Sequence, residues 1–373
     1  MKHAWLLNLT ANLVLLFLLF LKIFPRKRKE HPIPSRTKRI LLLRYDRLGD
    51  LICTTPLIDY LRSINPQIEI DCLASPNNEF LFREDERISN VTSLNGFSSL
   101  KEVWEMRYRN YDVIFSFIGE KPALDILFTT LTKTRGSYLS SIHEKRKYAR
   151  FYDFTPELVG KHYAARWLSL AVQTFSQLPL SEEDAEKHFP LSIRFKPSDL
   201  GSAFFLKHKL EKNNFIGINL SSGSASRKWG LERWAEFISL YQKEFPYPIV
   251  IFSTPTDFAT AKKLNRLFPT TVLFPYSYGF QRTAEIIKDA LLVITPDTGF
   301  MHAAAAVHTA VIELYASISE SGDIESWRPY GVRYRIVKSP QFFPLNHLEI
   351  KPVMEATRFL ISDIKNTNIF TKT

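Results

Sequence analysis

The stretch that most constrains the fold is Arg39–Pro56, which reads RILLLRYDRLGDLICTTP. Ile40–Leu43 is an apolar run of the length of a buried strand. A glycine-containing turn, Arg44–Gly49, follows, and Asp50 opens a segment whose apolar residues recur at helical spacing. A strand, a turn and a helix in this order are typical of an open α/β sheet, in which ligands bind beyond the carboxyl ends of the strands. We therefore expect Asp50 either to cap its helix or to face a ligand crevice.

Short apolar runs alternate with helical segments along the rest of the chain, which favours parallel α/β sheets. In the first half, strands are predicted at Ile40–Leu43, Ile68–Ala74, Val91–Leu94 and Val113–Phe117, and helices at Leu100–Arg109, Pro122–Leu131 and Lys161–Phe175. In the second half, strands are predicted at Phe215–Leu220, Ile249–Ser253, Leu291–Thr295 and Ala310–Tyr315, and helices at Leu231–Tyr241, Phe258–Leu267 and Met301–Val307. A chain of 373 residues exceeds one ordinary core. Two domains are therefore expected, joined through the polar segment Ser181–Asp199.

The amino terminus has the features of a membrane anchor. The apolar run Leu13–Leu21 lies inside Ala4–Phe24, and a helix of about 21 residues spans roughly 31 Å, the thickness of a bilayer's hydrocarbon core. A cleaved signal peptide is the competing interpretation, but it requires small residues after the apolar run, whereas basic residues follow here. Between Arg26 and Arg39 lie seven basic residues and one acidic residue, a net charge of +6 out of +11 for the whole chain. The positive-inside rule then predicts a single-pass protein whose domains after the anchor lie in the cytoplasm.

The two cysteines, Cys53 and Cys72, lie in apolar surroundings and lack metal-binding spacing. They are expected to be buried thiols in a reducing compartment.

Several common nucleotide and metal motifs are missing from the sequence. No G-x-G-x-x-G follows a strand and there is no Walker A sequence, which disfavours dinucleotide and P-loop sites. No Asp-x-Asp pair or clustered metal-ligand spacing occurs, so no metal site is predicted. A metal-free nucleotide site has to neutralise a diphosphate through helix amino ends, backbone N–H groups and Lys or Arg side chains.

The second half contains two candidate turns for such a site. Ser221–Ser226 is a small-residue turn after a strand, and Arg227 and Lys228 add positive charge to it. Asp297–Gly299 precedes an alanine-rich helix that carries His302 in its first turn. Each turn alone also fits an ordinary loop or a helix cap. Two strand–turn–helix units of this kind together favour an anion-binding site.

At these residues the sequence resembles glycosyltransferase family 9, whose best-known members are the ADP-heptose:lipopolysaccharide heptosyltransferases. The resemblance runs from about Arg39 to the carboxyl end. It rests on the segments Arg44–Pro56, Lys161–Tyr163, Ser226–Trp229 with Glu232–Trp234, Asp297–Ala305 and Trp327–Gly331. Among them, Asp297–Ala305 is the most specific match.

The resemblance implies an α/β protein of the GT-B fold, with two Rossmann-like domains facing a cleft. The N-terminal membrane helix expected from the apolar run precedes these domains and lies outside the resemblance. The expected parts are a membrane anchor helix at 1–25, a basic linker at 26–38, an acceptor-side domain at 39–190, a donor-binding domain at 191–345 and a C-terminal helix at 346–373 that packs back on the N-terminal domain. The anchor would lie in the bacterial inner membrane.

The resemblance also implies an inverting glycosyltransferase. It would move a heptose-like sugar from a nucleotide-diphosphate sugar, ADP-heptose, to a lipopolysaccharide core or another lipid-linked glycan, with no cofactor and no metal. Asp50 is the candidate general base, with Asp46 as a competing carboxylate in the same turn. The candidate donor contacts are Ser222, Arg227, Lys228, Asp257 at the ribose, Asp297, Thr298, Gly299 and His302. The candidate acceptor contacts are Arg47, Arg135, Lys145 and Arg146. The last three lie in a basic cluster that also fits a solvated loop.

Two other functions remain open from the sequence. One is a catalytically silent GT-B protein that binds a nucleotide sugar or glycolipid as a scaffold. The other is nucleic-acid binding, which is disfavoured because the chain contains no recognisable nucleic-acid module.

Overall fold

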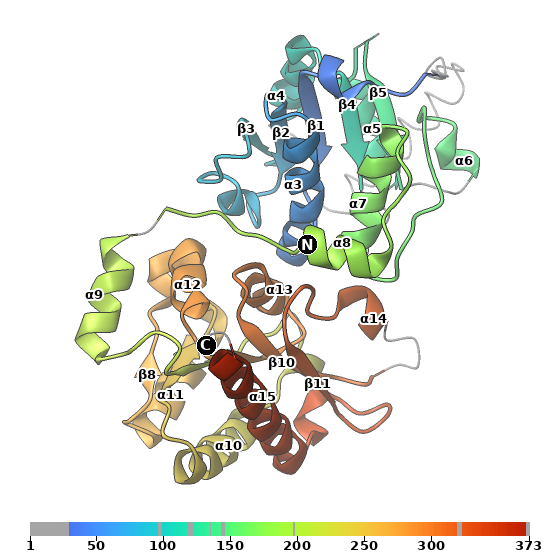
Figure 1. The fold of residues 1–373 in the computed structure, drawn as a ribbon. Coiled ribbons are helices and arrows are strands. Elements are labelled where there is room, and N and C mark those ends of the chain that lie inside the picture. The colour runs from blue at the N-terminus through green and yellow to red at the C-terminus, as the bar shows by residue number, and fades with distance from the viewer. Residues whose placement is uncertain are drawn as a thin grey trace. The chain divides into compact units, whose positions relative to one another are not determined.

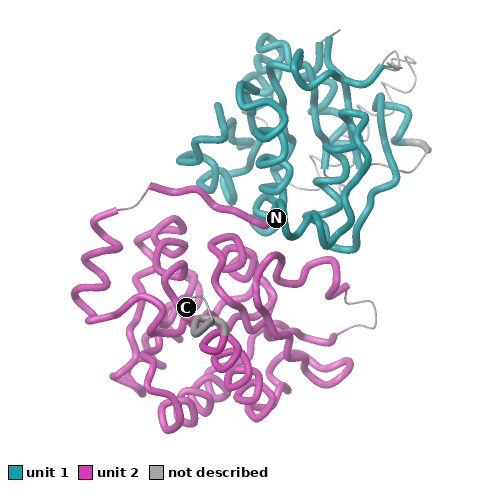
Figure 2. Tube along the Cα trace, viewed as in Figure 1, with its two compact units in different colours: residues 1–189 teal, residues 190–373 magenta. Residues whose placement is uncertain are grey.

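The computed structural model describes residues 30–95, 99–117, 122–134, 136–142, 146–196, 198–318 and 323–370. The chain forms two compact units, residues 1–189 and 190–373 (Figure 2). The division falls inside Ser181–Asp199, which is not purely a linker. Part of it forms α8 (Glu182–His188), and the Ser181 side chain caps this helix by accepting a hydrogen bond of 3.1 Å from the Asp184 N–H.

The first unit contains a five-stranded parallel sheet in the order β3-β2-β1-β4-β5 (Figure 1). Its strands are β1 (Arg39–Leu43), β2 (Glu69–Ala74), β3 (Asn90–Ser93), β4 (Val113–Ser116) and β5 (Tyr138–Ser141). Its described helices are α2 (Leu48–Ile52), α3 (Thr55–Ile64), α4 (Leu100–Glu105), α5 (Pro122–Thr132), α6 (Arg146–Ala149), α7 (Tyr163–Thr174) and α8. Helices α3 and α7 lie side by side, and α4 packs on α5.

The second unit contains a six-stranded parallel sheet in the order β11-β10-β9-β6-β7-β8. Its strands are β6 (Ile216–Asn219), β7 (Ile249–Phe252), β8 (Val272–Leu273), β9 (Leu292–Pro296), β10 (Ala310–Tyr315) and β11 (Tyr334–Lys338). Its described helices are α9 (Asp199–His208), α10 (Leu231–Glu244), α11 (Phe258–Leu267), α12 (Gly279–Lys288), α13 (Gly299–Ala306), α14 (Ile324–Trp327) and α15 (Ile350–Phe370). Both sheets have the strand order of a Rossmann-like domain, so the predicted pair of Rossmann-like domains is confirmed.

The alternation of side chains along β1 explains which helices cover the two faces of the first sheet. In β1, Leu41 and Leu43 join the core cluster that includes side chains of α4 and α5. Successive strand residues point to opposite faces, so Arg44, which follows Leu43, belongs to the other face. That face is the one covered by α7, because Arg44 stacks on Trp167 of this helix.

The packing of helix α15 differs from the expectation drawn from the sequence. The sequence predicts that the C-terminal segment packs back on the N-terminal domain, but α15 contacts α10, β10 and β11 of the second unit. The physical reason is its apolar face, on which Val353, Met354 and Leu360 belong to the same buried cluster as the strands of the second sheet.

The helix that follows β1 is also different from the prediction. One helix is expected to begin at Asp50, whereas the structure has α2 from Leu48 to Ile52 and a separate α3 from Thr55. The Thr54 N–H donates to the carbonyl of Leu51, three residues back, at 3.1 Å, and this tight turn ends α2.

The predicted membrane anchor lies in residues 1–29, outside the described residues. Among the helices that the structure describes, none is both long and apolar enough to cross a membrane.

Candidate active site

Four of the predicted site residues, Asp50, Arg227, Lys228 and Asp297, follow strands that lie where a sheet reverses its strand order. The chain leaves β1 towards β2 and later returns to β4 on the other side of β1, and β6 lies in the same way between β7 and β9. Open α/β sheets bind ligands outside the carboxyl ends of the strands at such a point. In the first sheet the segment after β1 carries Asp50. In the second sheet the segments after β6 and β9 carry Arg227, Lys228 and Asp297.

Asp50 lies in the first turn of α2. The N-cap residue of this helix is Arg47, so Asp50 is its third residue and does not occupy the capping position. The side chain is half-buried. A carboxylate in the first turn is stabilised by the helix dipole. Capping in the N-cap position is therefore excluded as the role of Asp50.

A fully buried arginine, Arg44, supports this turn. Its Nη2 donates to the main-chain carbonyl of Asp50, its Nε to Thr54 Oγ1 and its Nη1 to Asp46 Oδ2, each at 2.7 Å. The guanidinium carbon lies 3.7 Å from the centre of the Trp167 ring. From the sequence, Arg44 is identified only as part of the segment Arg44–Pro56. A charged residue at the end of a buried strand was the available signal.

Asp46 is the second carboxylate of the turn. Burial raises its pKa to about 7, the charges of Asp50 and Asp125 raise it too, and the Arg44 guanidinium opposes the shift. Asp46 and Asp50 therefore interact electrostatically, and the charge of one carboxylate changes the basicity of the other.

A buried polar cluster that the sequence analysis missed lies at the carboxyl ends of β4 and β5. The Ser116 and Tyr152 hydroxyls both donate to Asp125 Oδ2, the second at 3.0 Å. The Ser141 hydroxyl lies 3.2 Å from that of Ser116. Burial and the Asp125 charge raise the pKa of Tyr152, so its hydroxyl keeps its proton and remains a donor.

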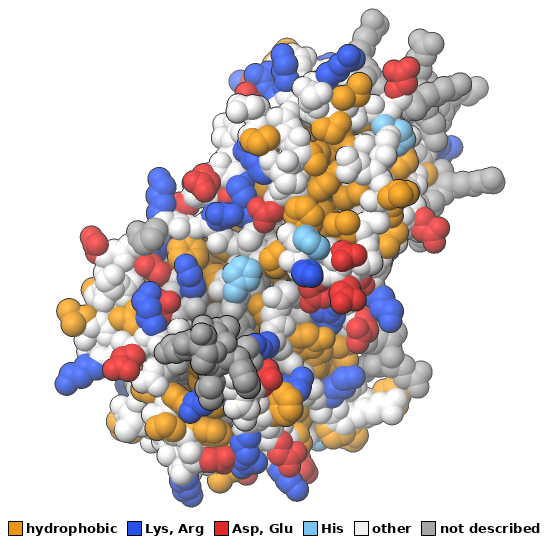
Figure 3. Space-filling view, in the orientation of Figure 1, with side chains coloured by type: hydrophobic (Ala, Val, Ile, Leu, Met, Phe, Trp, Pro, Cys, Tyr) orange, Lys and Arg blue, Asp and Glu red, His pale blue; other side chains and the backbone are white. Residues whose placement is uncertain are grey.

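The predicted acceptor contacts are not brought together in the described part of the chain. Arg47 is exposed beside Asp50. Arg135 and Lys145 lie outside the described residues, and Arg146 begins α6 but its side chain is not described. On the face seen in Figure 3, basic side chains are interspersed with acidic ones in both units.

In the second unit, hydrogen bonds join the turns that follow β6 and β7. Asn219 Nδ2 donates to Thr295 Oγ1 of β9 at 3.0 Å and to the carbonyl of Ser221 at 3.1 Å. The Thr254 N–H donates to Ser221 Oγ at 2.8 Å. The hydroxyl of Ser222, a predicted donor contact, is used within its own loop, where it donates to the Ser224 carbonyl at 2.6 Å.

Four of the predicted donor contacts form two ion pairs. Arg227 Nη1 lies 3.1 Å from Asp297 Oδ2 and also donates to the Asp297 carbonyl at 3.3 Å. The Lys228 ammonium pairs with Asp257 Oδ1. The two members of the first pair are 70 positions apart in the sequence, and those of the second pair are 29 positions apart. Each cation already has a carboxylate counter-charge, so an incoming phosphate would compete with Asp297 and Asp257 for hydrogen bonds.

Thr298 is the N-cap of α13, and its Oγ1 accepts a hydrogen bond of 3.3 Å from the Phe300 N–H. Gly299 is the first residue of the helix. The capping alternative is therefore realised at Thr298. The positive end of the α13 dipole lies beside the Arg227–Asp297 pair, which suits an anion.

His302 is buried in α13 and packs against Trp327, with ring centres 5.8 Å apart. Burial lowers its pKa to about 4. The ring is therefore neutral near pH 7, so it can hydrogen-bond to a ligand but carries no charge to balance a diphosphate.

The lowered pKa of His302 predicts a loss of stability in acid. Below pH 6.5 the unfolded chain takes up a proton at this residue, whereas the folded chain does so only near pH 4. The stabilisation that the neutral His302 ring contributes is therefore fully present above pH 6.5 and is lost as the pH falls from 6.5 towards 4. We expect His302 to contribute about 2 kcal/mol to the difference in unfolding free energy between pH 7 and pH 5, measured by urea unfolding of the full chain. The variant His302→Gln should lose this contribution, whereas replacing exposed His308 should not; equal pH dependence in His302→Gln and the unmodified chain would contradict the account.

Glu313 is a second buried carboxyl group that the sequence analysis missed. It lies in β10 and is 1% exposed, and its Oε2 has no hydrogen-bond partner within the described residues. Burial raises its pKa well above the usual range, and the charge of Asp297 adds to this effect. Glu313 is therefore protonated at neutral pH. A single acidic residue inside the apolar run Ala310–Tyr315 was the visible signal.

Other residues of the segments that resemble the family stabilise the fold instead of lying in a ligand site. Trp229 and Trp234 are buried in the second core with rings in edge-to-face contact, and Trp229 Nε1 donates to the Leu348 carbonyl at 2.9 Å. His162 is the N-cap of α7, and its Nδ1 accepts from the Ala164 N–H at 3.0 Å. The segments that resemble the family therefore contain core and capping residues as well as candidates for ligand contacts.

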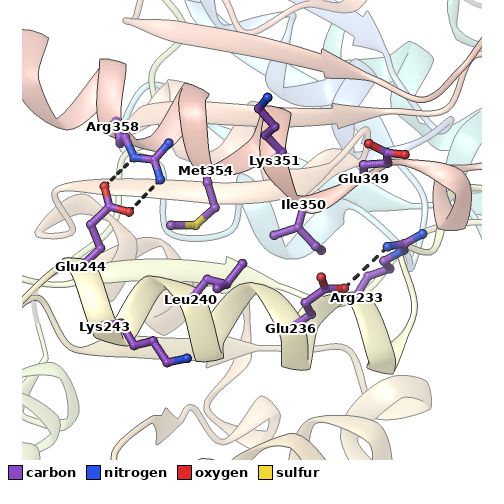
Figure 4. Close-up of a pocket in the computed structure, with 10 residues that line it drawn as sticks. All are labelled: Arg233, Glu236, Leu240, Lys243, Glu244, Glu349, Ile350, Lys351, Met354 and Arg358. Atoms are coloured by element: carbon purple, nitrogen blue, oxygen red, sulfur yellow. Dashed lines mark hydrogen bonds and ion pairs between the residues drawn. The ribbon is translucent and has the colours of Figure 1, made fainter.

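A groove of about 570 Å³ lies between α10 and the start of α15 (Figure 4). Leu240, Ile350 and Met354 supply its apolar side chains, and two ion pairs, Glu244–Arg358 at 2.5 Å and Arg233–Glu236 at 3.6 Å, lie along it. It contains none of the predicted site residues. Across the residues that the structure describes, no group of three or more His, Cys, Asp or Glu side chains is arranged to hold a metal ion.

Comparison with known proteins identifies relatives over most of the chain. The sequence profile described as "Glycosyltransferase family 9 (heptosyltransferase)" matches residues 106–356, which is more than half of the 373 residues. The chain is 22% identical to lipopolysaccharide heptosyltransferase 3 of Escherichia coli K12 over 301 residues, 76% of this chain and 82% of that protein.

Solved structures share the fold. A glycosyltransferase family 9 protein of Veillonella parvula superposes with a TM-score of 0.73 at 16% identity, covering 87% of this chain and 97% of that one. The E. coli heptosyltransferase WaaC, solved with ADP, superposes with a TM-score of 0.67 at 16% identity, covering 86% and 99%. The two parallel sheets are therefore those of a GT-B-like glycosyltransferase fold.

Proposed function

The chain belongs to glycosyltransferase family 9, and on this basis we propose that it transfers a heptose-like sugar, with inversion, from a nucleotide-diphosphate sugar to a lipopolysaccharide core or another lipid-linked glycan. The observation that carries the proposal is that each sheet presents one half of the required chemistry at its own switch point. The first carries a carboxylate in the first turn of α2, and the second carries two cations and the amino end of α13.

The proposed donor is ADP-heptose. E. coli WaaC, which has the same fold, was solved with ADP. In this chain, Arg227, Lys228 and the amino end of α13 are the proposed partners of the diphosphate. Asp257, which is 7% exposed and paired with Lys228, is the proposed partner of the ribose. Preorganised donors of this kind stabilise the charge that develops on a departing diphosphate, commonly a large contribution to catalysis.

The proposed base is Asp50. An inverting transfer requires removal of a proton from the acceptor hydroxyl as it attacks the sugar carbon, on the face opposite the leaving diphosphate. The matched family range begins after the Asp50 turn, so the assignment depends on the position of Asp50 in α2 and on the support it receives from Arg44. The competing carboxylate Asp46 is tied to Arg44 at 2.7 Å.

The proposed acceptor is a lipid-linked glycan. The related E. coli protein is named a lipopolysaccharide heptosyltransferase. In this chain the apolar run Leu13–Leu21 and the basic residues after it would hold the enzyme on the cytoplasmic face of the bacterial inner membrane.

The direct test is incubation of the full chain with a panel of radiolabelled nucleotide sugars and deep-rough lipopolysaccharide. We expect label from ADP-heptose to enter the lipopolysaccharide. Binding of the donor without transfer to any acceptor would instead favour the scaffold function.

The proposed anchor predicts how the protein partitions in a membrane fraction. The full chain should stay with membranes during alkaline carbonate extraction, because an apolar helix of about 20 residues is not released by high pH. A variant lacking residues 1–25 should be released while keeping the basic segment. Release of the intact full chain would contradict a spanning anchor.

A further inference from the structure

We propose that Arg44 is the positioning residue of the active site: its guanidinium fixes the main chain at Asp50 and holds Asp46 as a counter-charge beside it. This inference rests on the proposed function, because it assumes that Asp50 is the base. It goes beyond that function by assigning the orientation of the base to a residue that need not touch either substrate.

The break between α2 and α3 creates the need for such a residue. In a continuous helix the carbonyl of Asp50 would accept from the Thr54 N–H. Here that N–H donates to the carbonyl of Leu51 at 3.1 Å, and two side chains serve the Asp50 carbonyl instead. Arg44 Nη2 donates to it at 2.7 Å and Thr54 Oγ1 at 3.0 Å. The main-chain position of the proposed base is therefore set by side chains, and Arg44 makes the shorter bond.

Rigid elements on several sides hold the guanidinium. Its Nε donates to Thr54 Oγ1 at 2.7 Å, where α3 begins. Its carbon lies 3.7 Å from the Trp167 ring centre of α7 and 5.0 Å from that of Phe117, which follows β4. The backbone N–H of Arg44 itself donates to the Leu73 carbonyl of β2 at 2.8 Å. A planar fork that stacks and donates in three directions cannot be reproduced by lysine.

The charge around Asp46 gives Arg44 a second role. Arg44 Nη1 binds Asp46 Oδ2 at 2.7 Å, while the Asn78 amide of the next loop donates to the main-chain carbonyls of Arg44 and Asp46 at 2.9 and 3.2 Å. The charged groups that act on Asp46 are Arg44, Asp50 and, from α5, Asp125. Asp46 also acts on the buried thiols of Cys53 and Cys72, whose pKa values are raised chiefly by burial. The positive charge of Arg44 thus opposes the effect of the Asp50 charge on the neighbouring Asp46 carboxylate.

The chain offers a matched control for a buried arginine in the same unit. Arg87 is 6% exposed and forms ion pairs with Asp85 at 2.6 Å and Asp59 at 2.8 Å. Asp59 lies in α3 and Asp85 lies in the loop before β3, so neither carboxylate belongs to the Asp50 turn. Loss of Arg87 should therefore cost stability, as loss of Arg44 does, without moving the proposed base.

The experiment compares Arg44→Lys and Arg44→Ala with Arg87→Lys and Arg87→Ala in the full chain, measuring melting temperature, kcat and the donor KM. We expect Arg44→Lys to lower kcat about 10²-fold with an unchanged donor KM, because small misplacements of a catalytic group have effects of this size. Arg87→Lys should lower the melting temperature but not kcat. Guanidinium at non-denaturing concentration should restore part of the kcat of Arg44→Ala by filling the vacated position, and a merely structural role predicts no such rescue.

Three outcomes distinguish the positioning role of Arg44 from the base role of Asp50 or contradict one of them. If Arg44→Lys keeps full kcat while Asp50→Asn is inactive, Arg44 is not a positioning residue and the proposed function stands. If Asp50→Asn keeps full kcat, the proposed base itself is wrong. If Arg44→Ala fails to fold, Thr54→Val removes the other hydrogen bond to the Asp50 carbonyl, and an unchanged kcat in both Thr54→Val and Arg44→Lys contradicts the inference.

Discussion

Replacing Asp50 with Asn is expected to lower kcat by about 10²–10⁴-fold, the usual contribution of a general base, while leaving donor binding unchanged. The amide has nearly the shape of the carboxylate, and Arg44 and Thr54 bind the main-chain carbonyl of residue 50 rather than its side chain. The variant should therefore keep the main-chain hydrogen bonds of this turn and lose the ability to accept a proton. The measurement is steady-state transfer together with donor affinity by calorimetry.

Asp46→Asn is the matched control, since it removes the other carboxylate of the same turn. The charge of Asp50 raises the pKa of Asp46, and an electrostatic interaction of this kind acts on both members of a pair. Loss of the Asp46 charge should move the acidic limb of the kcat–pH profile to lower pH and leave most of the turnover. If Asp46→Asn abolished turnover while Asp50→Asn retained it, the roles of the two carboxylates would be exchanged.

Replacing Arg227 or Lys228 with Ala is expected to weaken ADP binding by about 10- to 100-fold, the range for a lost hydrogen bond to a charged group. Arg227→Ala should have the larger effect, because it also leaves the Asp297 carboxylate, now 3.1 Å from Arg227, without that counter-charge beside the diphosphate. Calorimetric titration of the full chain with ADP measures both.

The double variant Arg227→Ala/Asp297→Asn separates these two contributions. Removing both charges should recover part of the affinity lost in Arg227→Ala, because the pair is coupled. Lys212→Ala is the control for a surface cation, since Lys212 pairs with Asp289 at 3.0 Å elsewhere in the unit. If neither Arg227→Ala nor Lys228→Ala weakens binding, the turn after β6 is not the diphosphate site.

Strands with a strong local pattern could be predicted from the sequence. Ala310–Tyr315 is predicted and observed with the same bounds, and Ile40–Leu43 differs from β1 by one residue. The strands β5, β8 and β11 were not predicted. Half of β5 is serine, β8 has two residues, and β11 is an edge strand with only one buried position, so none shows a periodic apolar pattern.

The residues of the candidate site could be predicted, but not their pairings. Asp50, Arg227 and Asp297 are visible in the sequence because each lies in a short segment between a predicted strand and the apolar helical segment that follows it. Their partners depend on distances between chain segments, as in the Arg227–Asp297 pair, and on burial, as for the neutral ring of His302. The prediction that α15 packs on the first domain was wrong for the same reason, because amphipathic periodicity identifies a buried face but not the surface that buries it.

The anomeric configuration of the transferred sugar, determined by NMR of the product from a single-turnover reaction with ADP-heptose, tests the central claim most directly. A proton-accepting carboxylate at Asp50 and a diphosphate site at Arg227 and Lys228 predict that the configuration of the donor is inverted in the product. A product with the donor's configuration retained would contradict direct attack by a deprotonated acceptor, and with it the role assigned to Asp50.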